Sequence, residues 1–183
     1  MQRQIINNIN IIYGKIEELC TSVKRDKNEI TLIAVSKKKS HELIEIALDN
    51  GIENFGENYA QELKEKSFLI NSEKIIWHFI GPIQSNKVKI IANHADWIHS
   101  LEREKIIKKL DTECKKINKT INACLQVNIS NEESKSGCNP NDLIDLANLV
   151  ESMENINLRG IMALPELTPV SYTHLRAHET SNH

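Results

Sequence analysis

The chain has 183 residues, which is the length of one domain and enough to bury roughly 70% of the surface that the unfolded chain exposes. Its 23 basic and 25 acidic residues are mixed along the sequence and give a formal net charge of -2. We therefore expect neither a nucleic acid nor an anionic membrane as partner, because both select for a basic face. A small soluble ligand fits this composition better.

The start of the chain and its cysteines bear on the compartment. Residues 1–10 are polar and Asn-rich, without the apolar core of a signal peptide, and no run approaches the roughly 20 apolar residues of a membrane span. These features predict a cytoplasmic protein. The cysteines lie far apart, with no Cys-x-x-Cys pair and no His at ligand spacing, which predicts reduced thiols and no metal site at Cys20, Cys114, Cys124 and Cys138.

Short apolar runs alternate with longer amphipathic segments, the pattern of repeated β-α units around a parallel sheet. Before the first run, apolar residues at helical spacing predict an N-terminal helix on the outside of the domain or across one end: Ile5, Ile9, Ile12, Ile16 and Leu19. Six strands are predicted, over residues 31–36, 53–56, 76–81, 97–100, 123–129 and 158–164.

Helices are predicted between these strands. One follows Ser40 and ends at the Asp-Asn-Gly of residues 49–51, with a buried face made by Leu43, Ile46 and Ala47. Another opens at Asn139 and Pro140, because Asn is a good N-cap and Pro suits the first helical position. Its predicted buried stripe is Leu143, Leu146, Ala147 and Val150.

Four segments carry a family resemblance in the same order. Residues 32–37 read Leu-Ile-Ala-Val-Ser-Lys, residues 54–59 Asn-Phe-Gly-Glu-Asn-Tyr, residues 77–87 Trp-His-Phe-Ile-Gly-Pro-Ile-Gln-Ser-Asn-Lys, and residues 128–137 Asn-Ile-Ser-Asn-Glu-Glu-Ser-Lys-Ser-Gly. Together they resemble the YggS/PROSC family of pyridoxal phosphate (PLP)-binding proteins, single-domain relatives of the alanine racemase barrel. The resemblance implies an α/β fold, a TIM-type (β/α)8 barrel of PLP fold type III.

A complete barrel of this type has eight strands and about 250 residues. We therefore expect residues 1–168 to form a partial alanine-racemase-like barrel, with about six strands and the N-terminal helix. Residues 169–183 contain no Ile or Lys and hold three of the seven His. They resemble a translated sequencing-adapter read-through, so we expect a foreign or disordered tail after a C-terminal truncation.

The resemblance implies that Lys37 holds PLP as a Schiff base. PLP needs an amine for its aldehyde, an anion site for its phosphate and a partner for its pyridine nitrogen. Lys37 ends the first predicted strand, on the barrel face where active sites are built. By itself, the Lys run at residues 37–39 also fits a solvated charge cluster, and the family context favours the cofactor site.

Three further residues are candidate cofactor contacts. Asn58 follows the second strand and is a candidate to hydrogen-bond a ring substituent, or else to cap the next helix. His78 lies within the third strand and is a candidate to stack on or hydrogen-bond near the ring, or else is a satisfied core histidine. Met162, at the end of the sixth strand, either walls the pocket or is ordinary core.

Two polar tracts have open roles. Residues 84–87, Gln-Ser-Asn-Lys, are the most diagnostic tract of the family and either organise the loop above the site or begin the helix through residues 88–91. Residues 134–137, Ser-Lys-Ser-Gly, lie on a loop after the fifth strand that meets a ligand or partner, or is simply solvated.

The phosphate site is where the sequence departs from the family. The family's Ser/Gly-rich phosphate loop and the arginine that faces the pyridine nitrogen have no counterpart here, since Arg176 lies in the foreign tail. We therefore expect the 183-residue chain to bind PLP weakly.

The resemblance implies a non-catalytic protein of PLP homeostasis, with PLP as ligand, PLP-dependent apoenzymes as partners and a monomeric state. The alternatives are a PLP-dependent amino-acid racemase and a non-catalytic protein-interaction module. Racemases add a C-terminal β domain and a catalytic tyrosine from a partner subunit. Here Tyr13, Tyr59 and Tyr172 provide no convincing second acid or base.

Overall fold

The computed structural model describes residues 2–70, 72–129 and 136–164. These residues form one six-stranded sheet with strands in chain order, each parallel to its neighbours. The strands are β1 Ala34–Val35, β2 Asn54–Glu57, β3 Ile76–Phe79, β4 Trp97–Leu101, β5 Ile121–Val127 and β6 Ile156–Ala163. The predicted α/β class and strand order are confirmed.

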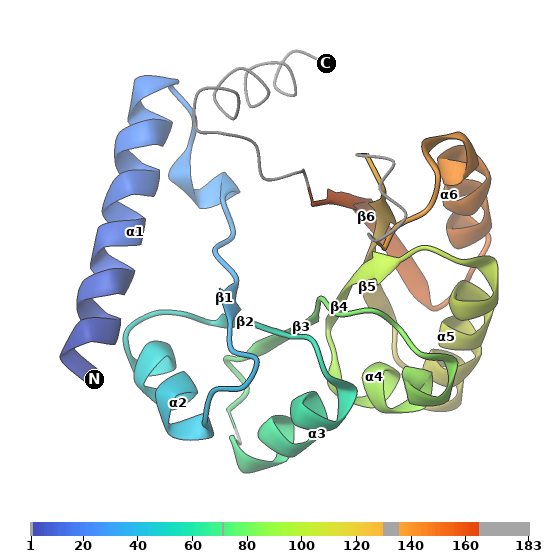
Figure 1. The fold of residues 1–183 in the computed structure, drawn as a ribbon, viewed down its shortest axis with the longest axis horizontal. Coiled ribbons are helices and arrows are strands. Elements are labelled where there is room, and N and C mark those ends of the chain that lie inside the picture. Colours follow the sequence, from blue (N-terminus) through green and yellow to red (C-terminus); the bar gives the residue numbers. More distant parts are fainter. Residues whose placement is uncertain (1, 71, 130–135, 165–183) are drawn as a thin grey trace.

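Helices connect the strands. They are α1 Gln2–Ser22, α2 His41–Asp49, α3 Ala60–Leu69, α4 Val88–His94, α5 Glu104–Lys116 and α6 Leu143–Glu151, with short 3₁₀ turns at η1 Lys27–Glu29, η2 Ser85–Lys87 and η3 Pro140–Asp142. Figure 1 shows the strands as an arc with α2 to α6 on its outer side and α1 beside the β1 end. In the described part of the chain β1 and β6 are not paired with each other, so the arc is an incomplete barrel.

The core lies between the outer helices and the sheet. Phe55 of β2 and Trp77 of β3 pack with ring centroids 6.1 Å apart, and Phe79 is 1% exposed. Ile107 and Leu110 of α5 are buried in the same cluster. Because side chains alternate along a strand, residues 54, 56 and 78 face the inner side of the arc, where Ile33 and Ile80 cover Gly56.

The first strand is shorter than predicted. It was expected over residues 31–36, but only Ala34 and Val35 pair with β2, at Phe55 and Gly56. An edge strand has a single neighbour, and because β2 begins at Asn54, residues 31 and 32 lie beyond the part of β2 that could pair with them. The fifth strand, expected at 123–129, runs over 121–127, because its pairing with β6 starts at Ile121.

The predicted helix ends are confirmed. The helix α2 ends at Asp49, and Gly51 has a φ of 90°, a conformation that favours glycine after a helix. Before α6, the Asn139 side chain accepts a hydrogen bond from the Asn141 N–H and caps η3. The N-terminal helix is also confirmed, although only its inner residues pack on the core, and Leu19 is 66% exposed.

Candidate functional site

Lys37 lies in a tight turn at the carboxyl end of β1. The turn spans residues 36–39, and the Lys39 N–H donates to the Ser36 carbonyl at 3.0 Å. Lys38, in the third position of this turn, has a φ of 58°, which is uncommon for a residue with a side chain. The side chain of Lys37 is exposed. The site candidate is thus an accessible amine on a defined turn at the edge where barrel sites are built.

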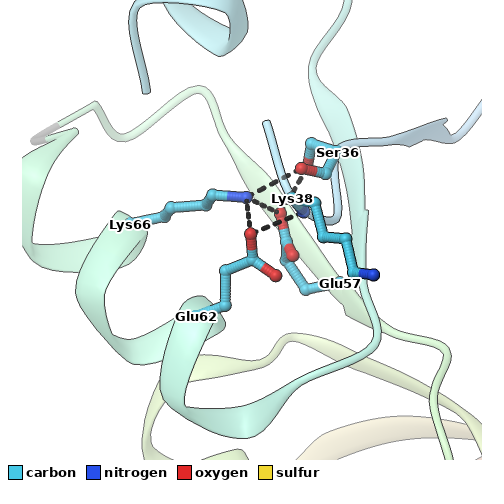
Figure 2. Close-up of polar contacts among 5 residues, drawn as sticks. All are labelled: Ser36, Lys38, Glu57, Glu62 and Lys66. Carbon is cyan, nitrogen blue, oxygen red and sulfur yellow. Dashed lines mark hydrogen bonds and ion pairs between the residues drawn. The ribbon is translucent and has the colours of Figure 1, made fainter. Parts of the chain in front are cut away.

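A buried polar network from α3 underlies this turn (Figure 2). The Lys66 ammonium donates to the Ser36 carbonyl at 2.7 Å, to Glu57 Oε1 at 2.7 Å and to Glu62 Oε1 at 2.9 Å. The Ser36 hydroxyl donates to Glu57 Oε1 at 2.6 Å, and the Lys38 N–H donates to Glu62 Oε1 at 2.6 Å. The peptide groups on both sides of Lys37 therefore bond to side chains of α3.

The network carries opposite charges away from water. Glu57 is fully buried, Lys66 is 5% exposed, and the three donors of the Lys66 ammonium each have an acceptor. Burial raises the pKa of the Glu57 carboxyl, while the hydrogen bonds from Lys66 and Ser36 oppose this rise. Glu57 Oε2 has no hydrogen-bond partner among the described residues. Loss of Lys66 alone would leave a buried carboxylate uncompensated.

Asn58 directly follows β2. The helix α3 begins at Ala60 with Tyr59 as its N-cap residue and without a side-chain cap, so the capping alternative for Asn58 is wrong. Within the described residues, the buried Asn58 Oδ1 has no hydrogen-bond partner. A Cβ added at Gly81 would lie 2.1 Å from the Asn58 carbonyl oxygen, so the segment that follows β3 packs directly on this residue. Asn58 offers an unused acceptor at a position fixed by its neighbour.

His78 belongs to a hydrogen-bonded chain on the inner face. Its Nε2 lies 2.9 Å from Asn54 Oδ1 and its Nδ1 lies 2.9 Å from His99 Nε2. Burial, then the nearby His99, lowers the pKa of His78 to about 4, and burial also lowers the pKa of His99. Because Asn54 Oδ1 only accepts, neutral His78 donates through Nε2 and accepts at Nδ1 from His99.

The His78 ring also stacks on Trp97, with centroids 5.7 Å apart, and the Arg159 guanidinium lies 5.6 Å from the Trp97 ring centre. His78 is 3% exposed, which fits the satisfied core histidine of the sequence analysis. Both ring nitrogens are occupied, so a contact with a cofactor would rely on packing. That contact stays a prediction.

Met162 is the next-to-last residue of β6 and pairs with Gln126. It is partly exposed and does not belong to the buried hydrophobic cluster of the described residues. The structure thus gives no support to Met162 as ordinary core. Its position near the carboxyl end of a strand is compatible with a pocket wall, which stays a prediction.

The candidates share one edge of the sheet only in part. Lys37 and Asn58 follow neighbouring strands, where Val35 pairs with Gly56. Met162 lies at the same carboxyl edge but in the last strand of the arc, and His78 lies inside β3. The structure therefore brings Lys37 and Asn58 together more directly than the other two.

The Gln-Ser-Asn-Lys tract begins a helix, which confirms one of its two interpretations in the sequence analysis. Residues Ser85–Lys87 form η2, which continues into α4. A cavity of about 250 Å³ lies beside it and is lined by Asn58, Tyr59, Phe79, Gln84 and Lys87 among others. The tract thus also forms part of the rim next to Asn58.

Sequence reasoning missed Glu62 and Lys66. A Glu and a Lys four residues apart on a helix usually form an exposed pair, so this spacing indicated nothing about a site. The feature that identifies them is the orientation of α3 against the sheet, which turns both side chains toward Ser36 and Glu57.

The loop after β5 is described only in part. Ser134 and Lys135 lie outside the described residues, as does the predicted tail at 169–183. The Gln126 side chain donates to the Ser136 carbonyl at 3.0 Å, and the Gly137 N–H donates to Glu102 Oε2 at 2.7 Å. The described end of this loop is therefore anchored to the protein.

The four cysteines are free in the structure, and burial raises the pKa of the Cys114 thiol to about 11. Within the described ranges, no cluster of three or more His, Cys, Asp or Glu side chains could hold a metal ion. None of the described helices combines the length and apolar character needed to cross a membrane.

The profile of the alanine racemase N-terminal domain family matches residues 11–171. A pyridoxal phosphate homeostasis protein of Pseudomonas aeruginosa is 44% identical over 164 residues, which are 90% of this chain and 71% of the relative. The chain belongs to the pyridoxal phosphate homeostasis protein family, also known as YggS/PROSC.

Solved structures agree with this membership. A protein of unknown function from Bifidobacterium adolescentis superposes with a TM-score of 0.83 at 26% identity, over 98% of this chain and 79% of the other. PipY of Synechococcus elongatus, with PLP bound, superposes with a TM-score of 0.76 at 28% identity, over 90% of this chain and 77% of PipY. An alanine racemase from Bartonella henselae superposes with a TM-score of 0.70 at 16% identity, over 98% of this chain and 48% of the racemase. This similarity shows the barrel-type fold alone.

Proposed function

We propose that this protein binds PLP and acts in PLP homeostasis, without a dedicated catalytic reaction. The observation that carries the proposal is an accessible lysine at the carboxyl end of the first strand, in a chain 44% identical to a PLP homeostasis protein. PLP supplies an aldehyde that condenses with an amine and releases water. The protein's part is to present the amine and hold the ring.

Lys37 is the proposed amine. It is exposed, and the turn that carries it is anchored by the buried network of α3. The nucleophile in Schiff base formation is a neutral amine, which attacks the aldehyde carbon. The lysines at 38 and 39 follow in the same turn but would not form the main adduct.

The unused acceptor on Asn58 fits a ligand. Its Oδ1 is buried and unbonded within the described residues, and a donor from the cofactor would satisfy it. We propose Asn58 as a hydrogen-bonding contact, His78 as a packing contact and Met162 as part of the pocket wall. The residues present therefore fit the cofactor at the ring.

The phosphate is the weak point of the proposed complex. The family's phosphate loop and pyridine-facing arginine have no counterpart in residues 1–168 of the sequence. A Schiff base without an anion site is easily hydrolysed, so the proposed affinity of the 183-residue chain is low. Tight, saturable PLP binding by this chain would contradict this point.

A homeostasis role implies release of the cofactor to PLP-dependent apoenzymes from a monomeric, cytoplasmic protein, and we propose these features together with the binding. Racemase activity has less support. The similarity to the Bartonella racemase, at 16% identity, concerns the fold. Cofactor-dependent exchange of an amino acid's α-proton would favour the racemase alternative.

Borohydride trapping tests the proposal. The protein is mixed with PLP, reduced and digested, and the pyridoxyl group is located by mass spectrometry. Lys37 should carry the main adduct, and Lys37→Ala should lose it, whereas the matched control Lys39→Ala should retain it. A main adduct on any other lysine would overturn the assignment of Lys37.

A further inference from the structure

The two peptide groups that flank Lys37 are both bonded to one helix. The carbonyl of Ser36 accepts from the Lys66 ammonium at 2.7 Å, and the N–H of Lys38 donates to Glu62 Oε1 at 2.6 Å. Glu62 and Lys66 are four residues apart on α3 and bond to each other at 2.9 Å. Side chains from one turn of α3 thus form hydrogen bonds with the backbone immediately before and after Lys37.

The turn needs such support. Lys38 has a φ of 58°, which costs a residue with a side chain energy unless the surroundings hold it. Figure 2 shows that the Lys38 side chain extends away from the network, so only its backbone takes part. Glu62 supplies a charged acceptor for the N–H of this strained residue, and charge-assisted hydrogen bonds are the stronger kind.

The base of the network is buried. Lys66 and Glu57 have side chains that are 6% and 0% exposed, and the Ser36 hydroxyl donates to the same Glu57 oxygen. Three acceptors surround the Lys66 ammonium, which leaves it no donor for water. An exposed Glu-Lys pair would contribute little, but here all three donors of the buried Lys66 ammonium are bonded, which restricts its geometry.

We propose that Glu62 and Lys66 are positioning residues for Lys37. They fix the backbone on both sides of this residue and so determine the direction in which its side chain leaves β1. The amine then reaches a ligand at one position instead of sampling several. This inference rests on the proposed function, since it names residues that serve the same site.

The first measurement uses the protein without cofactor. In Glu62→Ala the Lys38 N–H loses its acceptor, and its amide exchange should become about tenfold faster than in the wild type, the effect of one such hydrogen bond. In Glu62→Gln a neutral acceptor oxygen remains, and the exchange rate should lie between those of the wild type and Glu62→Ala. The matched control is Glu65→Ala on the same helix, where the lost bond is to Gln61.

The second measurement uses PLP and borohydride. In Glu62→Ala the ratio of adduct on Lys37 to adduct on Lys38 and Lys39 should fall about tenfold, because the side chains of the turn are no longer held in one direction. Glu62→Gln should restore part of the ratio, and Glu65→Ala should leave it unchanged. A purely structural role of Glu62 would lower the unfolding temperature without shifting this ratio.

Lys66 requires a variant that removes its buried partner charge as well. The double change Glu57→Gln with Lys66→Met avoids an uncompensated carboxylate, and it should reduce the Lys37 share of the adduct. If Glu62→Ala does not fold, Glu62→Asp keeps the charge but shortens the side chain, and should still speed Lys38 exchange.

The outcomes separate the two claims. Unchanged Lys38 exchange and an unchanged adduct ratio in Glu62→Ala would overturn the positioning role. If the wild type forms no adduct on Lys37, the proposed function fails, while fast Lys38 exchange in Glu62→Ala would still establish that α3 holds the turn.

Discussion

Acidification should destabilise the protein through His78. The folded state lowers the pKa of this imidazole from 6.5 to about 4, because the ring is buried and lies beside His99. Between these two values the unfolded state binds a proton that the folded state does not, so stability is fully present above the unfolded pKa and falls as the pH drops.

The size of the effect follows from the shift. The whole pKa difference corresponds to about 3 kcal/mol of unfolding free energy. At about pH 5 the protein has already lost about 2 kcal/mol of this stability. In a chain of this length that loss lowers the unfolding temperature by about 4–8 °C. The lowered pKa of His99 acts in the same direction.

Urea unfolding at a series of pH values from about pH 7.5 to about pH 5 measures this loss in the free energy of unfolding. His78→Gln removes the titrating group and should give a flatter pH dependence than the wild type, even if its stability at neutral pH is lower. The matched control for loss of a histidine is His41→Gln, at a partly exposed position outside this hydrogen-bonded chain. Parallel curves for wild type and His78→Gln, or an NMR titration of His78 near its ordinary pKa, would refute the reasoning.

Two glycine substitutions should act in opposite directions. Gly81→Ala places a Cβ 2.1 Å from the Asn58 carbonyl oxygen, so backbone must move and stability should fall by about 2–3 kcal/mol in thermal or urea unfolding. A stability change within about 0.5 kcal/mol would show that the two loops are loosely packed. Gly14→Ala, in α1 with nothing within 4 Å, should raise stability by about 0.5–1 kcal/mol through helix propensity, and a loss would contradict the exposed position.

The positions of the strands and helices were largely determined by the sequence. Short apolar runs, with amphipathic segments between them, predicted all six strands in the correct order. The stop at Gly51 and the cap at Asn139 are local signals, which depend on backbone conformations that a few neighbouring residues settle. Boundaries such as the start of β1 were less accurate, because strand ends depend on where the neighbouring strand begins.

The candidate site divides in the same way. Lys37 and Asn58 were accessible to sequence reasoning because each follows a strand within a recognisable motif, although their cofactor roles remain predictions. The capping alternative for Asn58 was settled only by the structure, since it depends on where α3 begins.

Only the tertiary structure revealed the hydrogen bonds between side chains of α3 and the turn after β1. Glu62 and Lys66 are a common helical pair in sequence, and the burial of Lys66 and the partial burial of Glu62 depend on how α3 packs against the sheet. The same holds for the bond between His78 and His99, which are 21 residues apart. Local patterns determined the elements, whereas contacts between distant segments decided which polar side chains became buried partners.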